Sequence, residues 1–112
     1  MIDEDFRTFA LGLPETSEGE HDGLTIFKVR GRRFATLGWP TPHKVAIVLN
    51  PWELDMLLAA GVPSVERAPG AWGLRGHAHL DLAMAEDATM RSVVTAAWRR
   101  CAPPRLRQSF ES

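Results

Sequence analysis

The sequence has little cysteine and no long apolar run. Cys101 is the single cysteine in 112 residues, which excludes an internal disulfide framework and fits a reducing compartment. No apolar stretch approaches membrane-spanning length, and the first residues are acidic, so neither a membrane helix nor a secretory signal is expected. Internal repeats and low-complexity tracts are also missing. These absences predict one cytoplasmic domain over residues 1–112, without a membrane partner.

A strong excess of either charge is missing too, because the formal net charge is −1. This balance counts against nucleic-acid binding, since domains with that function are usually basic. The charges are nevertheless unevenly spread. Residues 1–23 hold seven acids and one base, whereas residues 24–52 hold no acid and the bases Lys28, Arg30, Arg32, Arg33 and Lys44. Such alternating blocks allow opposed surface patches in three dimensions.

Residues 24–39 have the pattern of a β-hairpin. Two runs rich in β-branched and aromatic residues flank Gly31, which tolerates the positive φ of a tight turn. The central turn pair is either Arg30-Gly31 or Gly31-Arg32. By the two-residue period of a strand, both registers place Phe27, Val29 and Phe34 on a core face. The opposite face would carry Ile26, Lys28, Arg30, Arg33 and Ala35.

The remaining chain alternates between helical and extended patterns. Asn50 and Pro51 are typical of a helix start, and Gly61 of its end. The predicted elements are a helix over 3–12, a polar loop over 14–23, the hairpin, a buried strand over 45–49, a helix over 50–61, a weak strand over 62–67, a Gly-rich loop over 69–76, a strand over 77–84 and a helix over 86–102. The order α-β-β-β-α-β-β-α predicts an α+β two-layer sandwich, an antiparallel sheet with helices on one face.

The last predicted helix has a marked apolar stripe. Its residues are Met90, Val93, Val94, Ala97, Trp98 and Cys101. We expect this stripe to pack against the sheet, with Trp98 in the core and Cys101 as an inert buried thiol. Pro103 and Pro104 end the helix, and a flexible tail is expected from about residue 103.

Several of these motifs together resemble one known family. Leu13-Pro14-Glu15-Thr16 is followed by Phe27-Lys28-Val29-x-Gly31-Arg32-x-Phe34-Ala35, an Asn-Pro helix and a Gly-rich loop with Trp72. This arrangement resembles the MmcQ/YjbR family over residues 3 to about 102. The resemblance implies a CyaY-like fold described as a "double wing" and proposed to bind DNA, with no catalytic residues. Members often carry an aromatic residue where this chain has His77.

The basic hairpin is the first candidate site. Lys28, Arg30, Arg32, Arg33 and Lys44 are candidates for contacts to the phosphates of double-stranded DNA, with Arg75 of the Gly-rich loop as a further one. The alternative is a solvated sheet face whose charges prevent edge-to-edge aggregation.

Two other groups carry ligand chemistry. His77, His79 and Asp81 alternate along one strand face, and these residue types bind zinc or iron. They supply three ligands with no obvious fourth, so a polar strand face is the simpler interpretation. Trp39, Trp52 and Trp72 adjoin predicted loops, where indole rings either stack on bases or close a small core.

These observations favour a small non-enzymatic binding module. No phosphate loop or nucleophile motif is present, so no catalytic residue, metal or cofactor is assigned. DNA binding through the hairpin is the leading hypothesis. A protein-interaction or chaperone-like adaptor is the second, by fold analogy alone, and a metal-dependent enzyme using the histidine strand is the third. Nothing in the sequence sets the oligomeric state.

Overall fold

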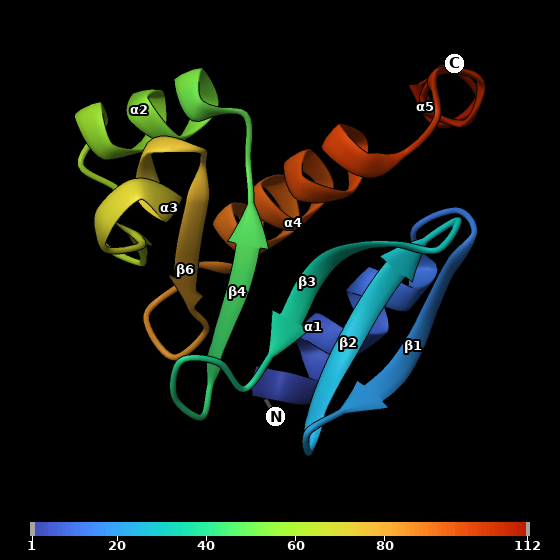
Figure 1. Ribbon diagram of the computed structural model, residues 1–112, viewed down its shortest axis with the longest axis horizontal. Helices are drawn as coiled ribbons and strands as arrows, with labels where there is room; N and C mark the ends of the chain where they lie inside the picture. The colour runs from blue at the N-terminus through green and yellow to red at the C-terminus, as the bar shows by residue number, and fades with distance from the viewer. Residues whose placement is uncertain (1, 112) are drawn as a thin grey trace.

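The computed structural model describes residues 2–111. A six-stranded antiparallel sheet, in the order β1-β2-β3-β4-β6-β5, is packed against helices (Figure 1). The elements are α1 (Ile2–Gly12), β1 (Thr16–His21), β2 (Leu24–Val29), β3 (Arg32–Leu37), β4 (Lys44–Val48), α2 (Pro51–Ala59), β5 (Val65–Arg67), α3 (Gly70–Leu74), β6 (His77–Asp81), α4 (Asp87–Cys101) and α5 (Pro104–Glu111). The predicted α+β sandwich is confirmed, with three elements more than expected.

The first additional element is β1, where a polar loop over 14–23 was predicted. β1 pairs with β2 along its whole length, from Thr16 opposite Val29 to His21 opposite Leu24. Asp22 and Gly23 both have positive φ, as a two-residue hairpin turn requires. The strand was missed because it is polar and largely exposed, and its backbone pairing leaves no apolar alternation in the sequence.

The β2–β3 hairpin forms in the first of the two predicted registers. Arg30 and Gly31 both have positive φ, and Val29 pairs with Arg32. Phe27, Val29 and Phe34 are buried in the core, as predicted.

A bulge changes which face Ala35 occupies. Phe27 pairs with Ala35 and Lys28 with Arg33, so Phe34 is an extra residue in β3. Phe34 and Ala35 therefore both belong to the core, and the placement of Ala35 opposite the core was wrong. A two-residue period cannot reveal an inserted residue.

The core lies between the sheet and α1 and α4. The predicted stripe of α4 is entirely buried, including Cys101. Trp98 is fully buried, and its indole N–H donates to the carbonyl of Pro14 at 3.1 Å. The Phe6 and Phe27 rings meet edge to face, with centroids 5.1 Å apart. These contacts fix one face of the sheet as the core side.

Helix α2 begins and ends where the sequence predicted, but not by the expected cap. Asn50 is the N-cap residue and Pro51 the first helical residue, while Gly61 follows the helix at a φ of +73°. The Asn50 side chain does not cap the backbone. It donates instead to the Glu53 carboxylate at 3.0 Å.

The Gly-rich segment 69–76 was predicted as a loop and contains the helix α3. Its glycines permit close packing: a Cβ on Gly73 would lie 2.1 Å from the Ala68 carbonyl oxygen, and one on Gly76 would lie 1.9 Å from that of Leu49. Gly76 also has a φ of +99°. The sequence alone does not distinguish a glycine needed for close packing against another backbone segment from a glycine needed for a turn.

The segment after Pro103 differs from the expected flexible tail. Residues 104–111 form α5, which buries Leu106 and brings the Phe110 ring to 5.1 Å from Trp98. Ser112, also part of the expected tail, lies outside the described residues. Within residues 2–111, no helix combines the length and apolar character needed to cross a membrane.

Candidate ligand-binding face of the sheet

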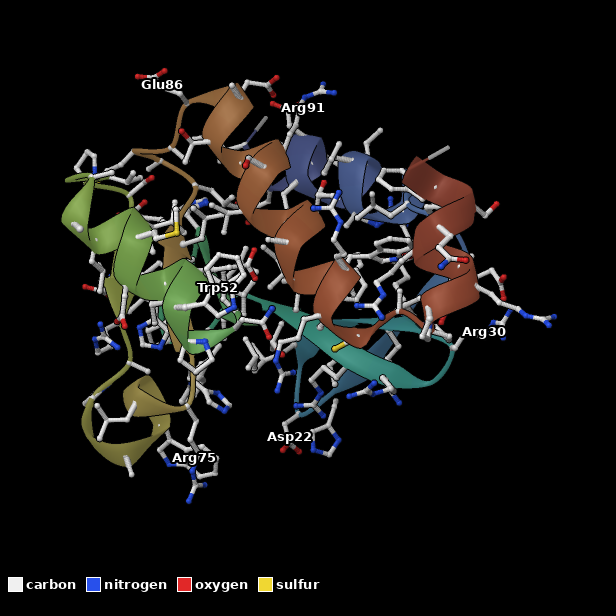
Figure 2. The ribbon with its side chains drawn as sticks, turned by 90° about the horizontal axis from the view of Figure 1, so that it is seen from above. Asp22, Arg30, Trp52, Arg75, Glu86 and Arg91 are labelled. Carbon is white, nitrogen blue, oxygen red and sulfur yellow. The ribbon has the colours of Figure 1, made fainter. Side chains whose placement is uncertain are left out.

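The side of the sheet opposite the core is free of the long helices. Figure 2 shows α1, α2, α4 and α5 gathered on one side, whereas α3 lies towards the other. We call that second side the open face. Register and strand alternation assign it Leu24, Ile26, Lys28, Arg33, Thr36, Lys44, Ala46, Val48, Glu66, His77, His79 and Asp81.

Three of the predicted cations are engaged by neighbouring groups. The Arg30 guanidinium holds the Glu15 carboxylate through two bonds of 2.6 and 3.0 Å. Lys44 donates to Glu66 at 3.0 Å, and Arg32 donates to the Cys101 carbonyl at the end of α4 at 3.3 Å.

The pairing with Glu15 keeps Arg30 occupied at neutral pH. The hydrogen bond from Arg30 holds the pKa of the Glu15 carboxyl below its usual value, and the same bond raises the pKa of Arg30. Both groups are therefore charged, and they neutralise each other at the surface. The acidic N-terminal part of the chain thus reaches the hairpin through Glu15.

The other three predicted cations are exposed without such partners. Lys28 and Arg33 are cross-strand neighbours on the open face. Arg75 follows α3 and lies over the Trp72 ring, 5.5 Å from its centroid, on the open side of the molecule (Figure 2). None of the three forms an ion pair with a residue that the structure describes.

Two adjoining hollows mark the centre of the open face. One, of about 290 Å³, is lined by residues of β3 and β4, among them Arg33, Thr36 and Val48. The second, of about 490 Å³, extends over β4 and β6 towards α3. They share the lining residues Trp39, Ala46, Ile47 and His77. We call the continuous depression the tryptophan groove.

Two exposed indoles flank this groove. Trp39 follows β3 and is 54% exposed, and Trp72 belongs to α3 and is 59% exposed. The floor between them comes from the paired strands β4 and β6, with Ala46 opposite His79. Trp52, which the sequence grouped with them, lies on α2 in the helical layer (Figure 2).

His77 lies within the groove beside Trp72. Their ring centroids are 4.9 Å apart at an interplanar angle of 74°. Burial, followed by the positive charges of Arg100 and Arg75, lowers the pKa of His77. The ring is therefore neutral at neutral pH, and its surroundings are electropositive.

The three metal-ligand candidates of β6 lie on one face of the sheet, as predicted, but two of them contact other groups. His77, His79 and Asp81 share the open face. His79 lies 3.4 Å from the Glu66 carboxylate, and Asp81 accepts a bond from the Ala83 backbone N–H at 2.9 Å. Within residues 2–111, no three or more histidine, cysteine, aspartate or glutamate side chains are grouped to hold a metal ion.

The sequence did not predict that Trp39 and Trp72 share a groove. Each tryptophan adjoins a proline-containing segment, but the partner of each is set by sheet order. β3 and β6 are distant in sequence and both pair with β4. Only that long-range pairing could have revealed the groove.

The architecture has a counterpart among solved structures. The crystal structure of Deinococcus radiodurans protein DR2400, described as a DUF419 domain, matches with a TM-score of 0.74 at 15% identity, over 97% of this chain and 87% of that chain. No protein-family model and no curated protein matches the sequence. The likeness therefore shows a shared fold.

Proposed function

We propose that this protein is a non-enzymatic DNA-binding module of the MmcQ/YjbR kind, which contacts phosphates through the open face. The observation that carries the proposal is the placement of Lys28, Arg33 and Arg75. All three are exposed on the helix-free side without an ion-pair partner among the described residues. The DUF419 fold and the hairpin motif support the family assignment.

The local charge matters more here than the net charge of −1. No carboxylate is among the described residues that line the tryptophan groove. Two glutamates beside the cationic hairpin are paired, Glu15 with Arg30 and Glu18 with Arg7. A phosphate backbone approaching the groove would therefore meet Arg33 and Arg75 with no carboxylate among the described lining residues, while Glu66 and Asp81 lie on the open face outside the groove.

Three phosphate contacts make binding weak and salt-dependent. At roughly 0.9 per contact, the slope of log K against log salt for duplex DNA is expected to be about −2.7. A fourfold rise in salt would then weaken binding about 40-fold. Binding of this kind needs no proton transfer or bond cleavage.

Fluorescence anisotropy of a labelled duplex, titrated with protein at several salt concentrations, tests the proposal. The wild-type protein should bind with the slope given above. Replacing Lys28, Arg33 and Arg75 together by glutamine should abolish measurable binding. The matched control replaces Arg30, Arg32 and Lys44 by glutamine, which removes the same charge from engaged positions. No binding of wild-type protein at tens of micromolar and low salt would contradict DNA binding.

A protein-interaction module is the second candidate, and a different surface favours it. Trp52 and Met56 of α2 are exposed beside a hollow of about 180 Å³ between α2 and α4. Aromatic and methionine side chains are enriched in protein interfaces. If this surface mediates association, Trp52→Ala should reduce self-association or partner binding in sedimentation experiments and leave DNA binding unchanged.

A further inference from the structure

The tryptophan groove has features that duplex binding does not use. Two indoles, Trp39 and Trp72, are each more than half exposed, although large aromatic residues normally bury their rings. The contacts of Trp72 to His77 and Arg75 hold its ring beside the groove. Exposed rings held at the edge of a depression can serve as stacking platforms.

The shape of the groove suits flat groups. Its floor includes the small Ala46 side chain and the flat His79 ring, between the two indoles. The volumes of about 490 and 290 Å³ lie in the range of small-molecule sites. A bare phosphate or a hydrated metal ion would gain little from such an apolar lining.

Cations surround this apolar floor. Arg33 lines the β3 end, and Arg75 lies beside Trp72 at the α3 end. A ligand that matches both features combines flat apolar groups with a negatively charged backbone.

We propose that the tryptophan groove binds unpaired bases, and that the protein therefore prefers single-stranded over duplex nucleic acid. The inference rests on the proposed function and specifies which form of nucleic acid the open face takes. Bases of a single strand would stack on Trp39 and Trp72, while Arg33 and Arg75 contact the phosphates. In a duplex the bases stack on one another, so their faces are closed to the indoles.

The test compares two labelled probes by anisotropy: an oligothymidylate of about 12 nucleotides and a duplex of the same length. Wild-type protein should bind the single strand at least about 10-fold more tightly, since stacking on one aromatic residue gives roughly that factor or more. The indole emission should be quenched on binding. The salt slope for the single strand should be about −1.4, at roughly 0.7 per contact for the two contacts from Arg33 and Arg75.

Single variants separate stacking from charge. Trp39→Ala and Trp72→Ala should each weaken single-strand binding by about 10-fold and leave duplex affinity unchanged. Trp72→Phe should retain most of the affinity, because the ring is kept. The matched control is Trp52→Ala, which removes an equally exposed indole (61%) from the helical layer and should change neither affinity. Thermal unfolding confirms that each variant is folded.

The outcomes distinguish this inference from the proposed function. Equal or tighter binding of the duplex, unaffected by Trp39→Ala and Trp72→Ala, would overturn the inference and leave DNA binding standing. Binding of neither probe at low salt would overturn both. A loss on Trp52→Ala equal to that on Trp72→Ala would place the contact elsewhere and also contradict the inference.

Discussion

The two faces of the sheet differ in how far their tryptophan side chains are exposed. On the core face, Trp98 is fully buried and its N–H is hydrogen-bonded to Pro14. On the open face, Trp39 and Trp72 leave most of their rings in solvent. Burial of apolar surface stabilises the fold, so the core face accounts for stability. The exposed indoles contribute little to stability, which leaves them available for a ligand.

The cations of the hairpin show a second contrast. Arg30 and Arg33 are three positions apart, yet the first is held by Glu15 and the second has no ion pair with a described residue. Each contributes one positive charge to a count made from the sequence alone. A cationic run therefore overstates the charge that a surface presents, because nearby carboxylates neutralise part of it.

The largest expected effect is on the free energy of unfolding, and it should differ between tryptophans on the two faces of the sheet. Trp98→Ala should lower the free energy of unfolding by about 3–5 kcal/mol, as truncation of a buried aromatic does. Trp72→Ala should cost less than about 1 kcal/mol, because surface substitutions cost little. Chemical denaturation measures both. A cost below about 1 kcal/mol for Trp98→Ala would show that α4 does not pack as described.

Alanine should be tolerated less well at Gly76, which precedes β6, than at Gly31 in the hairpin turn. Gly31→Ala should cost about 1–2 kcal/mol from its positive φ alone, because a Cβ there meets nothing within 4 Å. Gly76→Ala should cost more, since its Cβ would lie 1.9 Å from the Leu49 carbonyl oxygen and the backbone must shift. Urea unfolding measures the cost of each substitution. Equal costs would contradict the close packing of Gly76 against the Leu49 carbonyl.

Releasing Arg30 should strengthen the cationic surface. Glu15→Gln removes the ionised partner that holds Arg30. The freed guanidinium can then contact one more phosphate, so the salt slope for duplex DNA should steepen by about 0.9. Glu53→Gln, on α2, is the control and should leave the slope unchanged. An unchanged slope for Glu15→Gln would mean that Arg30 lies outside the contact surface.

The smallest expected effect is on the pH dependence of stability. Burial lowers the pKa of His77 in the folded protein below the ordinary histidine value of about 6.5. At a pH below that value, the His77 imidazole therefore takes up a proton more readily in the unfolded chain than in the folded one. The contribution of His77 to stability is thus complete above that pH and is lost as the pH falls towards the lowered pKa. His77→Gln should flatten the fall between pH 7.5 and 5. Urea midpoints across that range check it, and an unchanged profile would contradict the lowered pKa.

Much of the fold could be predicted because apolar periodicity reports burial directly. The α4 stripe and the β2–β3 pattern led to the core side chains that the structure contains. β1 was missed because a polar edge strand has no such pattern, although Asp22-Gly23 is a hairpin signal. α3 was missed because its glycines resemble those of a loop.

The candidate site was less predictable than the core. The basic residues were identified, but the carboxylates that engage Arg30 and Lys44 approach from β1 and β5 or their flanking residues. The groove depends on β4 lying between β3 and β6. Both are long-range consequences of sheet order, which local patterns do not encode.

The most direct test of the open face as the nucleic-acid surface compares Arg33→Gln with Arg30→Gln. The two variants lose the same charge from one hairpin and differ in whether that charge is engaged. Salt titration of duplex DNA binding should give a slope smaller by about 0.9 in magnitude for Arg33→Gln and an unchanged slope for Arg30→Gln. Equal changes in both variants, or a change confined to Arg30→Gln, would contradict the account.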